Sequence, residues 1–222
     1  MKSILFRVLV LSFISFQFTY ASVVDELSPA ELERVNQGKQ VVHLKDLSGK
    51  PWPEVTIYQR FLVSPEEIMA VFTDIEIQPE YMPNVLKASV SKRIHKTKEQ
   101  VDYQVDLPFP LSDESYTVEN TYVRESNDLY NVSWTLVRAD STREATGKAS
   151  FEKYHTSNFA GVIVGYRNLV VPDSSFAGPL KGQAIKQVKE LVQAIGDQTL
   201  LEKKEFPDFL NHQISLLRER FK

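Results

Sequence analysis

The sequence contains no cysteine among its 222 residues. This absence excludes disulfides, thiol catalysis and cysteine-ligated metal sites. It also excludes the lipid attachment that many exported bacterial proteins carry on a cysteine. An exported chain of this size without disulfides must be stabilised by its core, which suits a bacterial periplasm better than a eukaryotic secretory route.

The chain also lacks an excess of charge and is poor in glycine. Its formal net charge is -3 and its pI about 5.9, so no basic surplus indicates a nucleic-acid partner. Among the eight glycines there is neither a glycine-rich phosphate loop nor a G-x-S-x-G turn. Gly161 and Gly165 fall inside a predicted strand, where glycine indicates a bend or a close backbone approach.

Motifs for metal binding or catalysis are missing as well. The histidines are far apart in sequence and form no H-x-x-x-H pair: His43, His95, His155 and His212. We therefore predict no metal, no cofactor and no catalytic residue. The acidic residues Asp106, Asp113 and Glu114 read as a solvated turn rather than as an acid/base pair.

One long apolar run is present, at the beginning of the chain. MKSILFRVLVLSFISFQFTYAS has Lys2 and Arg7 before an uncharged stretch, with small residues leading to Ala21. This pattern predicts a signal peptide over 1–21 and a periplasmic or secreted protein. An uncleaved membrane anchor is the alternative, but the run is short for a spanning helix of about 20 residues.

Turn and cap residues divide the first half of the rest into short elements. Ser28-Pro29 and Ser64-Pro65 each predict a helix start, with the serine as cap and the proline in the first turn. Strands are expected over 40–47 and 54–63. In IEIQPEYMPN (75–84), Pro79 and Pro83 break the second helix. We assign 22–53 as an N-terminal helix-and-strand extension.

The second half predicts a meander followed by helices. Six strand-like segments with short connections occupy roughly 85–95, 99–107, 114–124, 128–138, 143–155 and 159–171. From Leu180 to Ile195 apolar residues recur at steps of three and four, which predicts a long helix that Gly196 closes. A second helix is expected over 206–222. This order indicates an α+β domain over 54–196, with a curved antiparallel sheet wrapped around the long helix and a helical extension over 197–222.

Alternation within the strands predicts a packed face that is rich in polar-tipped aromatics. One face carries Val101, Tyr103, Tyr116, Val118, Tyr122, Tyr130, Val132, Trp134 and Leu136, and the other is polar. Buried tyrosine and tryptophan need partners for their polar ends. Such a face either lines a polar-dotted ligand cavity or forms a solid core with phenols at its rim.

Three segments resemble the START (steroidogenic acute regulatory protein-related lipid transfer) family. They are LPFPLSDESYTVENTY, VFTDIEIQPEYMPNVLKASVSKR and VGYRNLVVPDSSFAGPLKGQAIKQVKELVQAI. The resemblance covers about residues 54–196 and implies a helix-grip fold of the Bet v1-like superfamily. The turn Asp113-Glu114-Ser115 and the loop 172–179 depart from the usual family pattern, so no role is assigned to them.

The resemblance implies a cavity between the sheet and the long helix, and the inward positions become its candidate ligand-binding residues. They are Tyr81, Met82, Tyr103, Phe109, Tyr116, Tyr122, Arg124, Trp134, Leu136 and Arg167. Arg124, Arg138 and Arg167 are in phase with inward residues. One of them is expected either to pair with a ligand head group in the cavity or to end its strand at the rim.

The sequence therefore favours a domain that binds, and possibly transfers, a lipid or other apolar small molecule. A cyclase- or aromatase-like enzyme on the same scaffold is an alternative, because a fold does not fix a function. A protein-interaction module with a filled cavity is another. The helical extension leaves a transient membrane contact open, and the sequence does not fix the oligomeric state.

Overall fold

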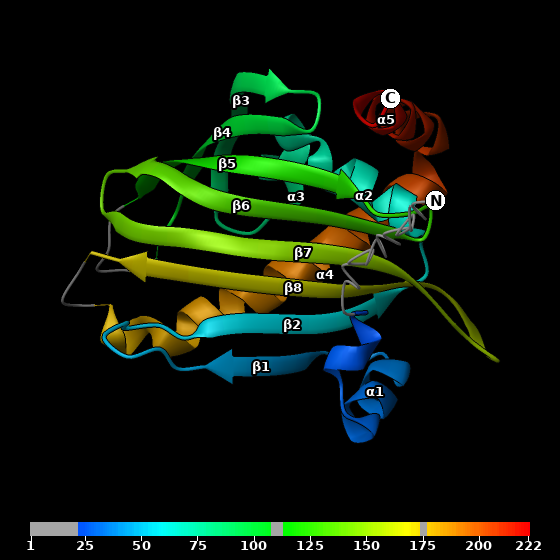
Figure 1. The fold of residues 1–222 in the computed structure, drawn as a ribbon, viewed down its shortest axis with the longest axis horizontal. Helices are drawn as coiled ribbons and strands as arrows, with labels where there is room; N and C mark the ends of the chain where they lie inside the picture. Colours follow the sequence, from blue (N-terminus) through cyan, green and yellow to red (C-terminus); the bar gives the residue numbers. More distant parts are fainter. Residues whose placement is uncertain (1–21, 108–112, 174–176) are drawn as a thin grey trace, which may run out of the picture.

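An eight-stranded antiparallel sheet dominates the computed structural model, which describes residues 22–107, 113–173 and 177–222. Its strand order is β1-β2-β8-β7-β6-β5-β4-β3 (Figure 1). The strands are β1 (Val41–Lys45), β2 (Glu54–Phe61), β3 (Val85–His95), β4 (Lys98–Val105), β5 (Glu114–Arg124), β6 (Leu129–Ala139), β7 (Thr142–Thr156) and β8 (Phe159–Pro172). The predicted meander is confirmed. The signal segment 1–21 stays a prediction, because it lies outside the described residues.

Capped helices join the first strands to the meander. Ser28 caps α1 (Pro29–Asn36) and Ser64 caps α2 (Pro65–Thr73), each in a capping box with the glutamate three residues on. A 3-10 turn, η2 (Ile75–Ile77), and the short α3 (Gln78–Tyr81) follow. Asn84, with a φ of 65°, then turns the chain into β3.

The long helix α4 (Lys181–Glu205) follows the short η3 (Gly178–Leu180). It crosses the far side of the sheet diagonally in the view of Figure 1. The expectation that Gly196 closes this helix is wrong, because α4 continues for more than two further turns. A Cβ built on Gly196 would lie 2.0 Å from Cε1 of Phe61. Glycine is therefore needed here for close helix–strand contact and not as a terminator.

The opposite, outer face of the sheet is partly covered, where the alternation predicted a polar face. The segment 22–36 packs there in a second core of Val23, Leu27, Val35, Val41, Tyr58, Tyr154, Phe159 and Ile163. The Glu152 carboxylate accepts hydrogen bonds from Ser22 Oγ and from the Val23 backbone N–H, each 2.6 Å long. The N-terminal extension is therefore packed against the same sheet that it joins through β1.

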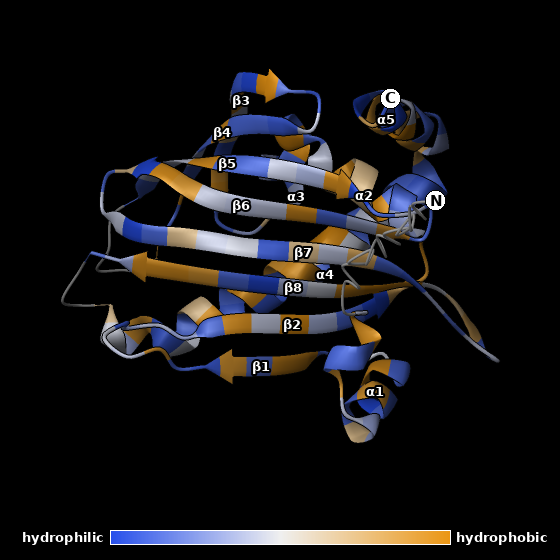
Figure 2. Ribbon diagram, in the orientation of Figure 1, coloured by the Kyte–Doolittle hydropathy of each residue, from blue (hydrophilic) through white to orange (hydrophobic). Residues whose placement is uncertain are grey.

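Elsewhere in the meander the predicted alternation holds, and apolar and polar residues alternate along β5 and β6 (Figure 2). A β-bulge interrupts it: Thr117 pairs with Arg138, but Val118 pairs with Leu136. Val137 is the extra residue, so Arg138 faces outward, where its Nε donates to Thr117 Oγ1 at 2.8 Å. The expectation that Arg138 is in phase with the inward residues is wrong because a bulge reverses the alternation.

The last helix, α5 (Pro207–Arg220), lies beside α2 at one end of the sheet (Figure 1). Its buried residues are Leu210, Gln213 and Leu217, and Ile214 and Phe221 pack against the main core. The apolar stripe predicted for this segment therefore packs on its own domain. None of the described helices is long and apolar enough to cross a membrane.

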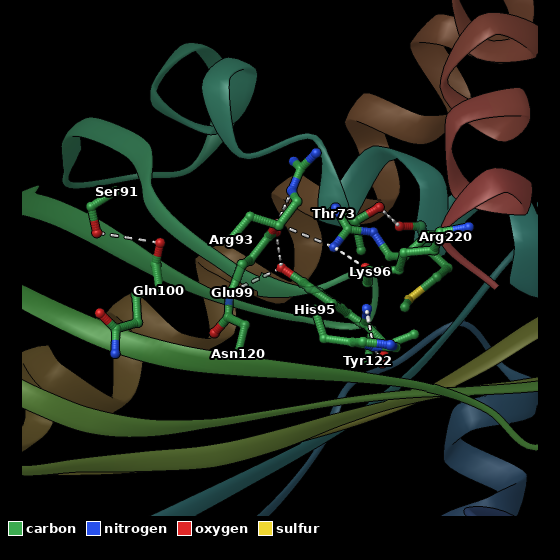
Figure 3. A network of polar contacts seen from close by, with 12 residues as sticks. Thr73, Ser91, Arg93, His95, Lys96, Glu99, Gln100, Asn120, Tyr122 and Arg220 are labelled. Atoms are coloured by element: carbon green, nitrogen blue, oxygen red, sulfur yellow. Dashed lines mark hydrogen bonds and ion pairs between the residues drawn. The ribbon is translucent and has the colours of Figure 1, made fainter. Parts of the chain in front are cut away.

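A buried carboxylate joins α5 to the sheet (Figure 3). Glu99 on β4 is fully buried, and its Oε1 accepts a hydrogen bond of 2.7 Å from the Tyr122 hydroxyl. Its Oε2 accepts no hydrogen bond within the described residues but lies 3.2 Å from Nη1 of Arg220. Arg220 also lies over the Tyr122 ring, 4.3 Å from its centroid. Arg93 Nε is 3.4 Å from Oε2, so two cations neutralise this carboxylate.

The close contact at Gly196 predicts the effect of a single methyl group. Gly196→Ala should lower the free energy of unfolding by about 1–3 kcal/mol, because the core must shift to admit the Cβ. Gly182→Ala is the matched control on the same helix. A Cβ there meets nothing within 4 Å, so stability should stay unchanged or rise by about 0.5 kcal/mol. Urea unfolding of both variants measures the difference, and equal effects would refute the role of the contact.

The ion pair between Glu99 and Arg220 predicts that removing the cation alone destabilises the fold more than removing both charges. Arg220→Met should destabilise the fold by about 3 kcal/mol, because the buried carboxylate loses its nearer cation. Adding Glu99→Gln should restore part of the loss, which a double-mutant cycle detects. Arg218→Met is the control on the same helix, since Arg218 pairs with Glu66 at the surface and should matter less. A cycle without coupling would contradict the assigned pair.

Candidate functional site

An inner chamber of about 130 Å³ lies between the concave face of the sheet and α4. Strands β4 to β8 provide most of its wall, α3 and the residues around it close one side, and Leu191 comes from α4. Its lining is Phe72, Gln78, Met82, Val85, Tyr103, Tyr116, Val118, Asn120, Trp134, Ala145, Tyr166, Asn168, Val170 and Leu191. The concave face is therefore not filled completely by the protein's own side chains.

A second cavity of about 160 Å³, here called the vestibule, adjoins the chamber. The two share Val85, Tyr116, Ala145, Asn168, Val170 and Leu191. The vestibule adds the first turns of α4, with Ala184, Ile185 and Val188, and the segment around Trp52. Trp52 Nε1 donates a hydrogen bond of 2.7 Å to the carbonyl of Ala177. The two cavities therefore lie next to each other under the N-terminal half of α4.

Aromatic rings set the shape of the chamber. Trp134 lies against its cross-strand partner Gly147, at which a Cβ would come within 2.2 Å of Trp134 Cζ2. Its ring centroid is 5.2 Å from that of Tyr166, and those of Tyr103 and Tyr116 are 5.5 Å apart. These distances are typical of favourable aromatic pairs, so the wall is stiff as well as apolar.

Uncharged polar groups interrupt this apolar lining. Tyr103 donates a hydrogen bond of 2.7 Å to Gln78 Oε1, whose Nε2 donates to the Phe72 carbonyl at 2.8 Å. Asn120 Nδ2 donates to the Tyr122 hydroxyl at 3.2 Å. Within the described residues, no hydrogen-bond partner is found for the Tyr116 and Tyr166 hydroxyls or the Asn168 side chain. These three groups are therefore available to a guest.

Burial keeps the phenols of the chamber protonated. It raises the pKa of Tyr116 to about 12, with a smaller contribution from the nearby Glu114 carboxylate. Burial also raises the pKa of Tyr103 and of Tyr166, because the charged form is disfavoured away from water. All three phenols act at neutral pH as uncharged donors and acceptors.

The only charges of the site's described lining belong to carboxylates of the vestibule. Asp106 is exposed, whereas Glu114 is buried. Glu114 Oε1 accepts a hydrogen bond of 2.9 Å from the Ser141 backbone N–H, and Oε2 accepts one from the Ser141 hydroxyl. Glu114 therefore holds the β6–β7 connection and has a structural role at the rim.

Four of the predicted site residues line the inner chamber: Met82, Tyr103, Tyr116 and Trp134. Tyr81 packs against the core, with its hydroxyl 3.4 Å from the Val71 carbonyl oxygen. Tyr122 faces inward but is bound to Glu99 beyond the end of the chamber. Leu136 is half-buried opposite Val118 and is not part of the lining. Phe109 lies outside the described residues.

Neither Arg124 nor Arg167 reaches into the cavity, and Arg124 takes the alternative position at the end of its strand. Tyr166 and Asn168 both face the chamber, so Arg167 between them points to the outer face, where its Nη2 lies 3.3 Å from Glu26 Oε2. Arg124 is exposed at the end of β5 and donates to Asn127 Oδ1 in the following turn. Both side chains are paired locally, away from the site.

The sequence analysis missed the contribution of β8 and of Gln78. Tyr166, Asn168 and Val170 alternate along β8 and line the chamber. Period-two alternation does not single them out, because the opposite parity of this strand, with Ile163, Leu169 and Val171, is apolar as well. Gln78 gave no signal either, because its place in the site depends on how α2 and α3 fold back onto the sheet.

A larger cleft of about 440 Å³ lies beneath α5. Its wall mixes Arg93, Lys96 and Arg220 with Asp74, Glu76, Glu99 and Glu219. Arg93 and Arg220 both pair with Glu99 in the contacts shown in Figure 3. No group of acidic or histidine side chains that could hold a metal ion occurs within residues 22–107, 113–173 and 177–222.

Solved structures of similar architecture come from bacteria and from human. A STAR-related lipid transfer protein from Xanthomonas axonopodis is 17% identical, with a TM-score of 0.62 over 72% of this chain and 93% of that one. Human STARD10 is 15% identical, with a TM-score of 0.58 over 76% and 74%. A START superfamily protein from Mycobacterium smegmatis is 15% identical, with a TM-score of 0.51 over 66% and 96%. At these identities the likeness establishes the fold.

Comparison at the level of sequence gives a family. No curated protein matches the chain. Residues 63–193 match the family model described as polyketide cyclase / dehydrase and lipid transport. This span contains most of the sheet and the part of α4 that lines the chamber. The chain therefore belongs to the polyketide cyclase / dehydrase and lipid transport family, and its domain has the START-like helix-grip fold.

Proposed function

We propose that this domain binds an apolar or amphipathic small molecule, such as a lipid, in the inner chamber and vestibule. The observation that supports this most is the pair of adjoining cavities under α4, walled by aromatic rings and containing neutral polar groups without a described partner. Cavities of this kind bind small ligands by burying apolar surface and orienting them through a few polar contacts. The similar proteins named as lipid transfer proteins support the same function.

Binding is favoured over catalysis by the composition of the wall. A cyclase would need an acid or base next to the reacting atoms. The inner chamber has no carboxylate and no histidine among its described lining residues. In the vestibule Asp106 is exposed, and Glu114 is engaged by the backbone and hydroxyl of Ser141. Packing of α5 on its own domain removes the main reason to infer a protein-interaction module.

The predicted signal peptide leads to a proposal about location. We propose that the chain is exported and that its domain works outside the cytoplasm. Cell fractionation with intact-mass measurement tests this, and a full-length mass in the cytoplasmic fraction would contradict it.

A search for a co-purified guest is the first test of binding. The purified chain is extracted with organic solvent and the extract is analysed by mass spectrometry. Uptake is then followed with an uncharged, environment-sensitive dye and competing alkyl compounds of increasing length. Each added CH₂ should improve the free energy of binding by about 0.8 kcal/mol, or about fourfold in Kd, until the site is full. A protein that carries nothing and takes up no compound would refute the proposal.

Filling the site from β7 should weaken uptake of the dye. Ala145 lines both cavities, so Ala145→Phe should weaken dye binding by about tenfold or more, equivalent to about 1.4 kcal/mol. Ala160→Phe is the matched control, because Ala160 is exposed on β8 and should bind as the parent does. Val188→Trp fills the vestibule from α4 and provides a second plug if the first variant is unstable. Unchanged binding in both folded plug variants would place the guest elsewhere.

A further inference from the structure

The distribution of charged residues around the site restricts the charge that a ligand's head group can carry. Within the described parts of the chain, the walls of the inner chamber and vestibule contain no lysine, arginine or histidine. The two internal segments outside the described ranges, 108–112 and 174–176, contain no charged residue in their sequence. A negatively charged head group would therefore enter a site that holds no counter-charge for it.

The vestibule opposes an anion further. Asp106 and Glu114 line the vestibule. A carboxylate or phosphate of a ligand held there would be repelled by these two carboxylates. Arg167, which directly precedes Asn168 on β8, points to the opposite face of the sheet and is paired with Glu26. Arg138 faces the same outer side and lies 3.4 Å from Asp102.

What the site offers instead is neutral hydrogen bonding. Asn168 lines both cavities and has a donor and an acceptor in one side chain. The Tyr116 and Tyr166 hydroxyls add two groups that can each donate and accept. A hydroxyl, carbonyl, ester or amide satisfies such groups without bringing a charge.

Resting on the binding function proposed above, we infer that the ligand is an apolar molecule whose polar end is uncharged. The site accepts alcohols, ketones, esters or amides on an apolar body and rejects carboxylates and phosphates. Asn168 is the residue that determines this specificity, because it lies where the chamber meets the vestibule and no described partner occupies its amide.

The test compares ligands of one chain length and different head groups. Decanol, decanamide, decanoate and decyl phosphate are titrated against the purified full chain with the uncharged dye. A carboxylic acid of pKa about 4.5 is only about one part in a thousand protonated near pH 7.5. If only the neutral form enters, its apparent Kd is about a thousandfold weaker than its intrinsic value. That Kd should fall about tenfold for each pH unit lowered toward pH 5.5, whereas the Kd of decanol stays constant.

Replacing Asn168 with a cationic residue should reverse the site's preference for uncharged over anionic head groups. Asn168→Lys should bind decanoate at neutral pH and lose the pH dependence of that binding. Ala160→Lys adds the same charge at an exposed position of the same strand and should leave both unchanged. If Asn168→Lys does not fold, the pH dependence of the parent protein alone decides.

The outcomes separate the two proposals. Binding of decanol and decanamide with a steep pH dependence for decanoate supports the inference. Equal, pH-independent binding of decanoate and decanol overturns it while the binding function stands. Failure of every compound to bind refutes the binding function itself.

Discussion

The contact between Gly196 and Phe61 determines where space remains beneath α4. The helix crosses the sheet diagonally (Figure 1), and at Gly196 its backbone comes so close that no Cβ fits. Toward its N-terminus the same helix faces the rings of Trp134, Tyr116 and Tyr166 across the chamber and vestibule. A helix that is held close to the sheet at Gly196 and meets bulky rings toward its N-terminus leaves space between helix and sheet there. The binding site is thus a consequence of unequal residue size along one helix–sheet interface.

Much of this fold could be predicted from the sequence because its signals are local. Serine-proline caps, period-two alternation and short polar turns gave α1, α2 and the whole meander, with strand boundaries within about two residues. The prediction failed where the local structure depends on contacts with residues far away in the sequence. Gly196 reads as a terminator until Phe61 is placed against it, and Arg138 reads as inward until the bulge at Val137 is known. The outer core over Tyr154 and Phe159 depends on where the segment 22–36 folds back.

The candidate site was only partly predictable for the same reason. Tyr103, Tyr116 and Trp134 follow from alternation within one strand each, and Met82 from its position after a broken helix. The arginines were assigned to the cavity because they were read as in phase with inward residues, whereas the phase of β8 in the structure places Arg167 outside. Which groups a concave surface leaves unpaired depends on side chains from four or more elements, and no single stretch of sequence contains that information.

Charge separation connects the stability of the domain with its choice of ligand. The carboxylate of Glu99 is buried on the concave side next to Asn120, but Tyr122, Arg93 and Arg220 satisfy or neutralise it, so α5 confines this charge to the far end of the sheet (Figure 3). The chamber proper is left with neutral groups, of which Asn168 and two phenols have no described partner. A cavity in the core weakens the folded state, because the side chains that line it lack packing partners there. A neutral guest that fills the cavity and hydrogen-bonds to these polar groups stabilises the fold in proportion to RT ln(1 + [L]/Kd). The features that make the empty domain less stable than a solid core are therefore the same ones that favour an uncharged ligand.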